Sequence, residues 1–145
     1  MERLLALKRV PLFANLTLEQ LEAIHQLTVE SSYLPGEIIL REGDLGGELY
    51  LLLEGAVDVY LNHGTAAQEH TRMLEAADYF GEMTIFDEQP RSATIVARDP
   101  TRLLALDGAS LKELIAKMPE VAFDFMRVLA TRLRFAEHRD GGESR

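Results

Sequence analysis

The sequence contains no cysteine, and this absence excludes disulfide bonds and thiolate chemistry. No apolar run approaches the length that a membrane-spanning helix requires, and Met1-Glu2-Arg3 does not open a secretory signal. From these absences we expect a cytoplasmic protein without a membrane segment.

Positive charge is also scarce, because 15 lysines and arginines stand against 24 aspartates and glutamates and leave a net charge of −9. A surface built for nucleic acid normally needs a clustered positive face. The most basic stretch lies along one predicted helix and is interrupted by acidic residues, as is typical of a solvated helix face; its arginines are Arg127, Arg132, Arg134 and Arg139. Only a handful of residues follow His138, too few for a DNA-recognition helix, so we predict no DNA binding by this chain.

The sequence also lacks a recognisable catalytic grouping. A metal centre needs converging histidine and carboxylate ligands. The four histidines His25, His63, His70 and His138 are dispersed, and no two of them are spaced as metal ligands on one element. The serines also lack a plausible base partner, so none is a candidate nucleophile. We therefore predict that the protein is not an enzyme and holds no metal.

What remains is the composition of an ordinary globular domain. The chain has 145 residues, of which 47% are apolar and 27% are charged. This length suits one domain with a sizeable core, so we assign residues 1–145 to a single domain.

Helical signals dominate the first 28 residues. Apolar residues recur at helical spacing over 4–10, and Pro11 ends that pattern. Thr17 and Gln20 form a capping-box pattern, which predicts a helix over about 18–27.

Residues 29–107 have the texture of a β-roll, with short apolar runs between turn residues. Gly55 lies between two of these runs and predicts a hairpin with positive φ at the glycine. Leu49 and Leu51, or their neighbours of opposite strand parity, are expected to line a ligand pocket inside the roll; the sequence leaves both registers open. The predicted strands are 38–40, 49–53, 56–61, 70–74, 95–97 and 102–106.

Helical patterns return over 108–139. Ser110 and Glu113 form a second capping-box pattern, and Pro119 suits the first turn of a last helix. Residues 140–145 have the composition of a frayed tail.

An apolar stripe follows this last helix through Val121, Phe125, Leu129 and Leu133, with Met126 beside it. One interpretation is that the stripe packs back onto the roll. The alternative is a homodimer interface along the helix.

Two short segments carry the chemistry, Phe80-Gly81-Glu82-Met83-Thr84-Ile85 and Arg91-Ser92-Ala93-Thr94. A guanidinium binds phosphate through a planar fork of charged hydrogen bonds, each contributing roughly 1.5–3 kcal/mol. An ionised Glu82 only accepts hydrogen bonds, so a sugar hydroxyl is a suitable partner. Gly81 permits close approach of the backbone, and a helix that begins beside it directs free N–H groups at an anion. A 3′,5′-cyclic nucleotide satisfies all of these groups.

At these residues the chain resembles the cyclic-nucleotide-binding domain family, which includes the bacterial catabolite activator protein, the regulatory subunits of protein kinase A and cyclic-nucleotide-gated channels. A second segment, 39–46, and the run 49–55 after it are similar to the family's glycine-punctuated β-roll segment. The resemblance extends from about Val10 to about Ala136. It implies a mainly β fold: an antiparallel β-roll of the double-stranded β-helix or jelly-roll type. N-terminal helices, a short phosphate-binding-cassette helix near Glu82 and C-terminal helices would flank this roll.

The resemblance also implies roles for individual residues. The cassette positions are Phe80, Gly81, Glu82, Met83 and Thr84, followed by Arg91, Ser92 and Ala93. In the family, serine or alanine at the position of Ser92 is common in adenine binders, whereas threonine is often linked with guanine. Thr84 departs from the usual alanine, serine or glycine, which puts the affinity for a nucleotide in question. Arg132 lies in the stretch of the last helix that would cover the base, with an exposed helix arginine as the alternative.

We therefore predict a regulatory sensor that binds a cyclic nucleotide, with cAMP favoured over cGMP, and needs no other cofactor. Binding would reposition the C-terminal helices and act allosterically on an unknown protein partner or a fused effector. The alternative is a domain that keeps the fold as a protein-interaction module and has lost the ligand.

Overall fold

Two antiparallel sheets of four strands each form the body of the protein. This computed structural model describes residues 2–143, and the side chains of Glu2, Met83 and 136–143 lie outside the description. One sheet has the order β1-β8-β3-β6 and the other β2-β7-β4-β5. The strands are β1 (Thr28–Tyr33), β2 (Ile38–Leu40), β3 (Glu48–Glu54), β4 (Ala56–Leu61), β5 (Glu69–Glu75), β6 (Tyr79–Phe80), β7 (Thr94–Ala97) and β8 (Thr101–Asp107).

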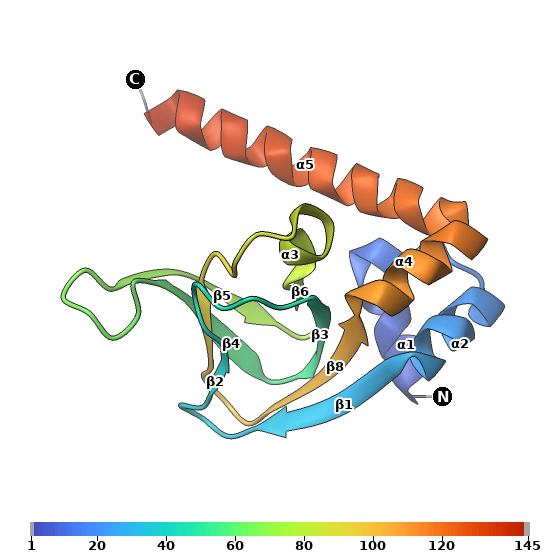
Figure 1. Cartoon of the computed structure of the whole chain (residues 1–145), viewed down its shortest axis with the longest axis horizontal. Helices are drawn as coiled ribbons and strands as arrows, with labels where there is room; N and C mark the ends of the chain where they lie inside the picture. Colours follow the sequence, from blue (N-terminus) through green and yellow to red (C-terminus); the bar gives the residue numbers. More distant parts are fainter. Residues whose placement is uncertain (1, 144–145) are drawn as a thin grey trace.

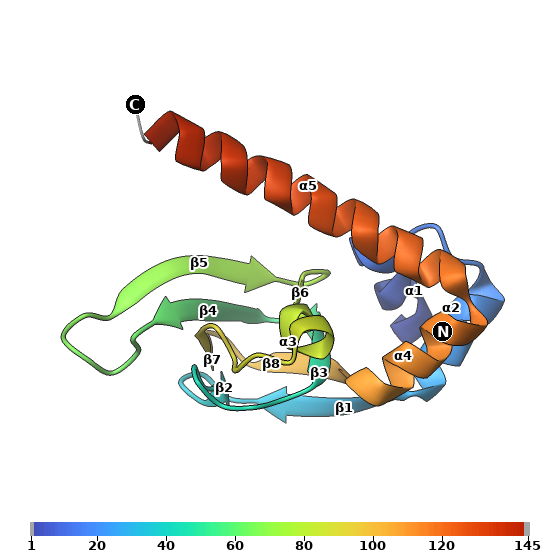
Figure 2. The same cartoon turned by 45° about the horizontal axis from the view of Figure 1, so that its top comes forward.

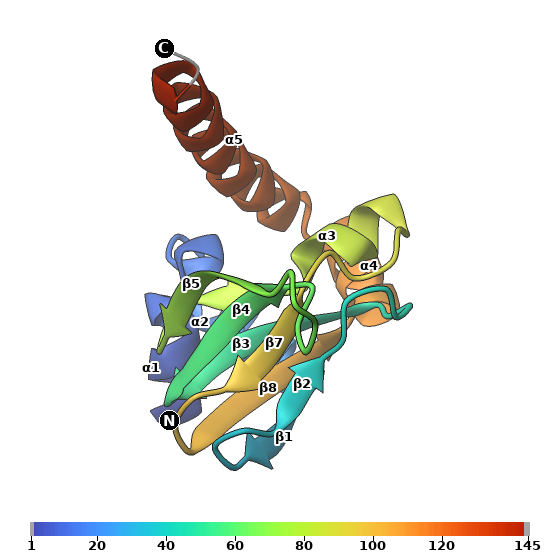
Figure 3. The ribbon, with the colours of Figure 1, turned by 90° about the vertical axis from the view of Figure 1, so that its left-hand side faces the viewer.

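Helices precede and follow the strands in the sequence, and one short helix lies between β6 and β7. They are α1 (Glu2–Arg9), a 3₁₀ turn η1 (Pro11–Phe13), α2 (Leu18–Gln26), the short α3 (Glu82–Asp87), α4 (Gly108–Lys117) and α5 (Pro119–Glu143). In Figure 1, α1, α2 and α4 gather at one end of the roll, and α5 runs across it with α3 between. In Figure 2, α1, α2 and α4 again lie together at one end of the roll, and α5 runs past the β4 and β5 side of it. Seen along the roll in Figure 3, the far part of α5 extends away from the sheets. The predicted β-roll with flanking helices is thus confirmed.

The capping box predicted from Thr17 and Gln20 is present at the start of α2. The Thr17 hydroxyl accepts a hydrogen bond from the Gln20 N–H at 3.1 Å, and the Gln20 side chain accepts one from the Thr17 N–H at 2.9 Å. Two N–H groups that the helix leaves unpaired are satisfied in this way, so local chemistry decides where α2 begins.

Two predictions about the C-terminal helices were wrong. Asp107, not Ser110, is the N-cap of α4, and its carboxylate accepts a hydrogen bond from the Ser110 N–H at 3.3 Å. Aspartate is as good an N-cap as serine, and choosing it lets the helix follow β8 directly. The last helix continues to Glu143, where the sequence predicted an end at 139 and a tail over 140–145. Gly141 and Gly142 weaken a helix by about 1 kcal/mol each but do not block its hydrogen bonds.

Strand β3 is apolar on both faces because it separates two clusters of buried side chains. Leu49 and Leu51 pack with the helices in one cluster, and Tyr50 and Leu52 lie in the other, inside the roll. The neighbours of opposite parity, left open as an alternative in the sequence, are therefore the residues that face the interior. This double burial explains the uninterrupted apolar run of the strand.

Among residues 2–143, no helix is both long and apolar enough to cross a bilayer.

The β3–β4 hairpin turns at Gly55, whose φ of +97° confirms the predicted positive value. A Cβ atom there would overlap the Pro100 carbonyl oxygen and lie 2.8 Å from Thr101 Cα. Gly36 has a similar φ of +90°, but nothing lies within 4 Å of its Cβ position. A side chain at Gly36 would therefore suffer backbone strain alone, whereas a side chain at Gly55 would suffer both strain and steric overlap.

We predict that Gly55→Ala lowers the free energy of unfolding by about 2–5 kcal/mol, since strain and overlap add. Gly36→Ala, which suffers strain alone, should lose only about 1–2 kcal/mol. Urea denaturation of the two variants measures the difference. Equal losses would show that the hairpin relaxes around the new methyl group.

Candidate functional site

A cavity of about 270 Å³ lies between the inner face of the β2-β7-β4-β5 sheet and α3. Its apolar wall comes from side chains of β2, β4 and β7, and its polar wall from the start of α3 and the segment before β7. The lining residues are Leu40, Val59, Leu61, Thr71, Arg72, Phe80, Gly81, Glu82, Thr84, Arg91, Ser92, Ala93 and Ile95. The structure therefore brings together both predicted segments, which lie apart in the sequence.

Gly81 is the N-cap of α3 and has a φ of +88°. A Cβ atom on it would lie 2.7 Å from the Glu48 carbonyl oxygen and 2.8 Å from Arg91 Nη1. Both its backbone conformation and its surroundings therefore require glycine. This requirement positions the first turn of α3 against the Arg91 side chain.

Arg91 is buried, with 5% of its surface exposed. Its Nη1 donates to the Thr84 hydroxyl at 2.8 Å, to the Gly81 carbonyl at 3.2 Å and to the Glu48 carbonyl at 3.3 Å. All of these acceptors are neutral, and Arg91 forms no ion pair with any residue that the structure describes. A buried guanidinium without a counter-ion is costly, so this position is suited to an anion.

The Thr84 side chain turns back onto the cassette. Its hydroxyl donates to the Gly81 carbonyl at 3.1 Å and accepts from Arg91. In this rotamer the larger side chain, a departure from the family pattern, acts as a partner that orients the arginine.

Glu82 is also buried and is paired with an arginine from the last helix. Its carboxylate accepts a hydrogen bond from Arg132 Nη1 at 2.9 Å. The Arg132 guanidinium lies over the Tyr79 ring, 4.2 Å from its centroid, as a cation–π contact. Burial raises the pKa of Tyr79 to about 12, so the ring that carries this contact is a neutral phenol at neutral pH.

Three of the four remaining predicted positions line the cavity. Phe80 lines it and stacks on Tyr50 with ring centroids 5.2 Å apart. Ser92 is exposed and Ala93 is half-buried, and both line the cavity directly after Arg91. Met83 lies in the first turn of α3, and its side chain is outside the described part of the chain.

Two lining residues on β5, Thr71 and Arg72, were not predicted from the sequence. The Arg72 side chain forms no hydrogen bond or ion pair with a residue in the described part of the chain. The period-two pattern of a strand does not predict that two consecutive residues face one cavity, so no sequence signal identifies the pair.

Two contacts connect α3 with α5. One is the Glu82–Arg132 ion pair, and the other is an edge-to-face contact between Phe86 and Phe125 with centroids 5.5 Å apart. Phe125 is 3% exposed and also contacts Phe13 of η1. These contacts join the short helix α3 to the side chains that hold the last helix.

Comparison with known proteins gives a consistent assignment. Residues 30–118 match the cyclic nucleotide-binding domain. The chain is 36% identical over 131 residues to the cyclic AMP receptor protein of Thermus thermophilus, covering 90% of this chain and 61% of the receptor. It is 38% identical over 114 residues to a putative potassium channel protein of Rhodopseudomonas palustris, covering 79% of this chain and 27% of the channel protein.

The crystal structure of the catabolite activator protein of Thermus thermophilus superposes with a TM-score of 0.85 at 35% identity, over 92% of this chain and 63% of that one. The chain thus spans 61% of the length of one curated relative and 27% of the other. Because the family match extends over more than half of its residues, the chain belongs to the cyclic nucleotide-binding domain family.

Proposed function

We propose that this chain is a regulatory sensor module that binds a 3′,5′-cyclic nucleotide and passes the binding event through its helices to a protein partner or a fused effector. The observation that carries the proposal is the buried Arg91, whose charge has no counter-ion among the described residues and which lines the cavity. A cyclic phosphate supplies the missing negative charge. Family membership and the similarity to a cyclic AMP receptor protein support the same ligand class.

In this proposal Arg91 binds an exocyclic phosphate oxygen, with Ser92 as a neighbouring hydroxyl donor. Thr84 and the Gly81 carbonyl hold the arginine before the ligand arrives, which reduces the ordering that binding must impose. Glu82 accepts a hydrogen bond from the ribose 2′-hydroxyl. Because Glu82 is bonded to Arg132, the ribose either displaces Arg132 or shares the carboxylate with it. Either event changes a contact between the site and α5.

We favour cAMP over cGMP because Ser92 matches the residue common in adenine binders of this family. One observation supports cGMP as a second candidate, namely Arg72 in the cavity wall. Guanine presents O6 and N7, two acceptors, to a guanidinium that only donates, whereas adenine presents one acceptor and one donor. The base side of the site is therefore where the two ligands would be distinguished.

A module that has lost its ligand is the alternative function. Loss of binding normally removes one of the charged groups, yet Glu82 and Arg91 are both present and both line the cavity. Thr84, which raised this alternative, has its hydroxyl bonded to Gly81 and Arg91. The sensor is the better supported of the two, and neither function requires catalysis by this chain.

The exposed face of α5 supports a further part of the proposal, a homodimer through this helix. Val121 and Phe125 pack on the core, but Phe123, Met126 and Leu133 are 67%, 54% and 64% exposed. Residues 123, 126, 130 and 133 follow the alternating spacing of three and four that forms a coiled-coil seam. A second copy of α5 is the simplest partner for such a seam.

Replacing Arg91 tests the phosphate contact. Arg91→Ala should weaken cAMP and cGMP binding by at least about tenfold, since a charged hydrogen bond is worth about 1.5–3 kcal/mol. Isothermal titration calorimetry measures this, with Arg134→Ala on the exposed part of α5 as the charge-matched control. Saturable binding that is equal in wild type and Arg91→Ala would contradict the assignment. The absence of binding in wild type freed of co-purified nucleotide would favour the interaction module.

The ribose contact is tested with 2′-deoxy-cAMP. The wild type should bind it at least about tenfold more weakly than cAMP, because the ligand then lacks the hydroxyl that donates a charged hydrogen bond to the buried Glu82 carboxylate. Glu82→Ala should bind both ligands with nearly equal affinity. Discrimination that persists in Glu82→Ala would assign the 2′-hydroxyl to another residue.

The seam on α5 is tested with Leu133→Glu. At micromolar concentration this variant should sediment as a monomer while the wild type sediments as a dimer, because the substitution places like charges opposite each other. Arg134→Glu, the adjacent residue outside the seam, is the control and should leave the dimer intact. A wild type that is monomeric with and without nucleotide would refute the dimer.

A further inference from the structure

The pairing of β4 with β5 contains a one-residue irregularity next to the cavity. Val59 pairs with Arg72, whereas the following residue Tyr60 pairs with His70, so Thr71 is an additional residue on β5. The Thr71 hydroxyl donates to the Val59 carbonyl at 3.2 Å. The strand therefore contains a β-bulge at Thr71.

This bulge determines which β5 side chains reach the cavity. Thr71 and Arg72 both line it, although consecutive residues of a regular strand point to opposite faces. His70, which pairs with the outward-facing Tyr60, lies on the outer face of the sheet. If the pairing at Arg72 continued without the bulge, Leu61 would pair with His70, and His70 would then point to the cavity side.

Burial alone specifies this register weakly. β5 is the edge strand of its sheet, and Leu74 is its one buried residue. An edge strand with so little buried surface is prone to slip by one residue. A specific polar contact on the outer face is needed to exclude that slip.

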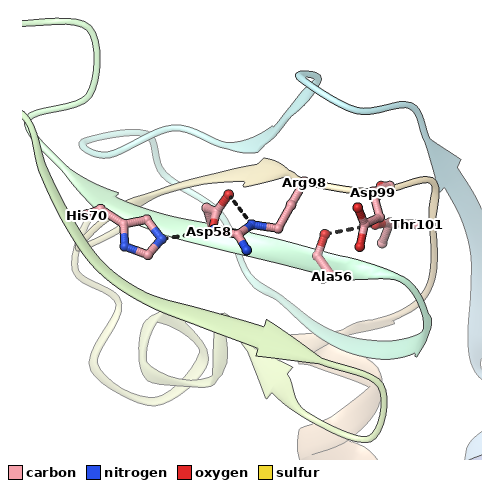
Figure 4. A network of polar contacts seen from close by, with 6 residues as sticks. All are labelled: Ala56, Asp58, His70, Arg98, Asp99 and Thr101. Carbon is pink, nitrogen blue, oxygen red and sulfur yellow. Dashed lines mark hydrogen bonds and ion pairs between the residues drawn. The ribbon is translucent and has the colours of Figure 1, made fainter.

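Three side chains on the outer face provide such a contact; we call Asp58, His70 and Arg98 the Asp58 cluster. Figure 4 shows His70 and Arg98 meeting the Asp58 carboxylate from opposite sides. His70 Nε2 lies 2.8 Å from one carboxylate oxygen, and Arg98 Nε lies 3.1 Å from the other. The Arg98 N–H donates to the Ala56 carbonyl at 2.9 Å, which fixes Arg98 beside β4.

Asp58 is 8% exposed, so the carboxylate at the centre of the cluster is buried. Burial raises the pKa of this carboxyl, but the hydrogen bonds from His70 and Arg98 outweigh burial and lower it overall. Asp58 is therefore ionised at neutral pH, and it holds its two partners through charged hydrogen bonds, which are stronger than neutral ones.

We propose that the Asp58 cluster is a positioning device on the outer face of the roll: by holding His70 outside, it fixes the β5 bulge, keeps the imidazole out of the cavity and sets Thr71 beside Arg72 as a side chain that reads the base. The inference rests on the proposed nucleotide site for its functional half. The structural half, the fixed register, stands on the β4–β5 pairing alone.

The experiment compares Asp58→Asn and His70→Phe with wild type. Glu69→Gln, an exposed residue of the same strand, is the control that removes one negative charge outside the cluster. One readout is the ratio of the dissociation constants for cAMP and cGMP, with Thr71→Val as the reference. The other is NMR, through the cross-strand contacts Val59–Arg72 and Tyr60–His70.

In both cluster variants the affinity ratio should differ from that of wild type by roughly three- to tenfold, as it should in Thr71→Val, while Glu69→Gln stays near wild type. In a His70→Phe background Asp58→Asn should change the ratio little further, since the two substitutions break the same contact. A loss of stability alone would not change the ratio. The contact between residues 60 and 70 should weaken or give way to one between Leu61 and residue 70.

Unchanged contacts and an unchanged ratio in both cluster variants would overturn the inference. If the wild type binds neither nucleotide, the proposed function fails, and the cross-strand contacts alone then decide whether the cluster fixes the register.

Discussion

The buried guanidinium of Arg91 is the constraint on which the rest of the site depends. It needs acceptors, and it takes them from β3 through the Glu48 carbonyl and from the cassette through Gly81 and Thr84. The Arg91 backbone also bonds the loop after β2, since its N–H donates to Asp44 and its carbonyl accepts from Gly43. One side chain and its peptide groups thus tie a strand, a loop and a helix start to a single point. Its positive charge remains without a counter-ion in the described chain, which makes the cavity suited to an anion.

The parts of this site that the sequence predicted are those encoded by short-range chemistry. Gly81 and Glu82 are adjacent, Arg91 follows on the same connection, and the capping box of Thr17 depends on two residues of one turn. What the sequence did not predict is a contact between distant elements. Arg132 was predicted to lie near the base, but its pairing with Glu82, fifty positions away, cannot be inferred from the pattern of either helix.

Thr71 was missed for a different reason. Its placement beside Arg72 requires a bulge, and a bulge changes the face of a residue without altering the hydrophobic alternation of the sequence. The extent of α5 was misjudged because glycines lower helix stability only gradually, so composition gives no sharp end. By contrast, Gly55 was predictable because positive φ at a tight hairpin is a local requirement.

The length of α5 gives the small rearrangements at the site a mechanical consequence. With 25 residues the helix is about 37 Å long, and its first turns, around Val121 and Phe125, are the part buried against the body. Because the helix is buried against the body at its first turns, near α3, any tilt at this base is amplified along its length. A tilt of about 10° at the base displaces the far end by about 6 Å, given the rise of about 1.5 Å per residue. In the proposed sensor, a ligand that moves one side-chain contact near Glu82 would thus displace the far end of α5 by about the length of one helical turn.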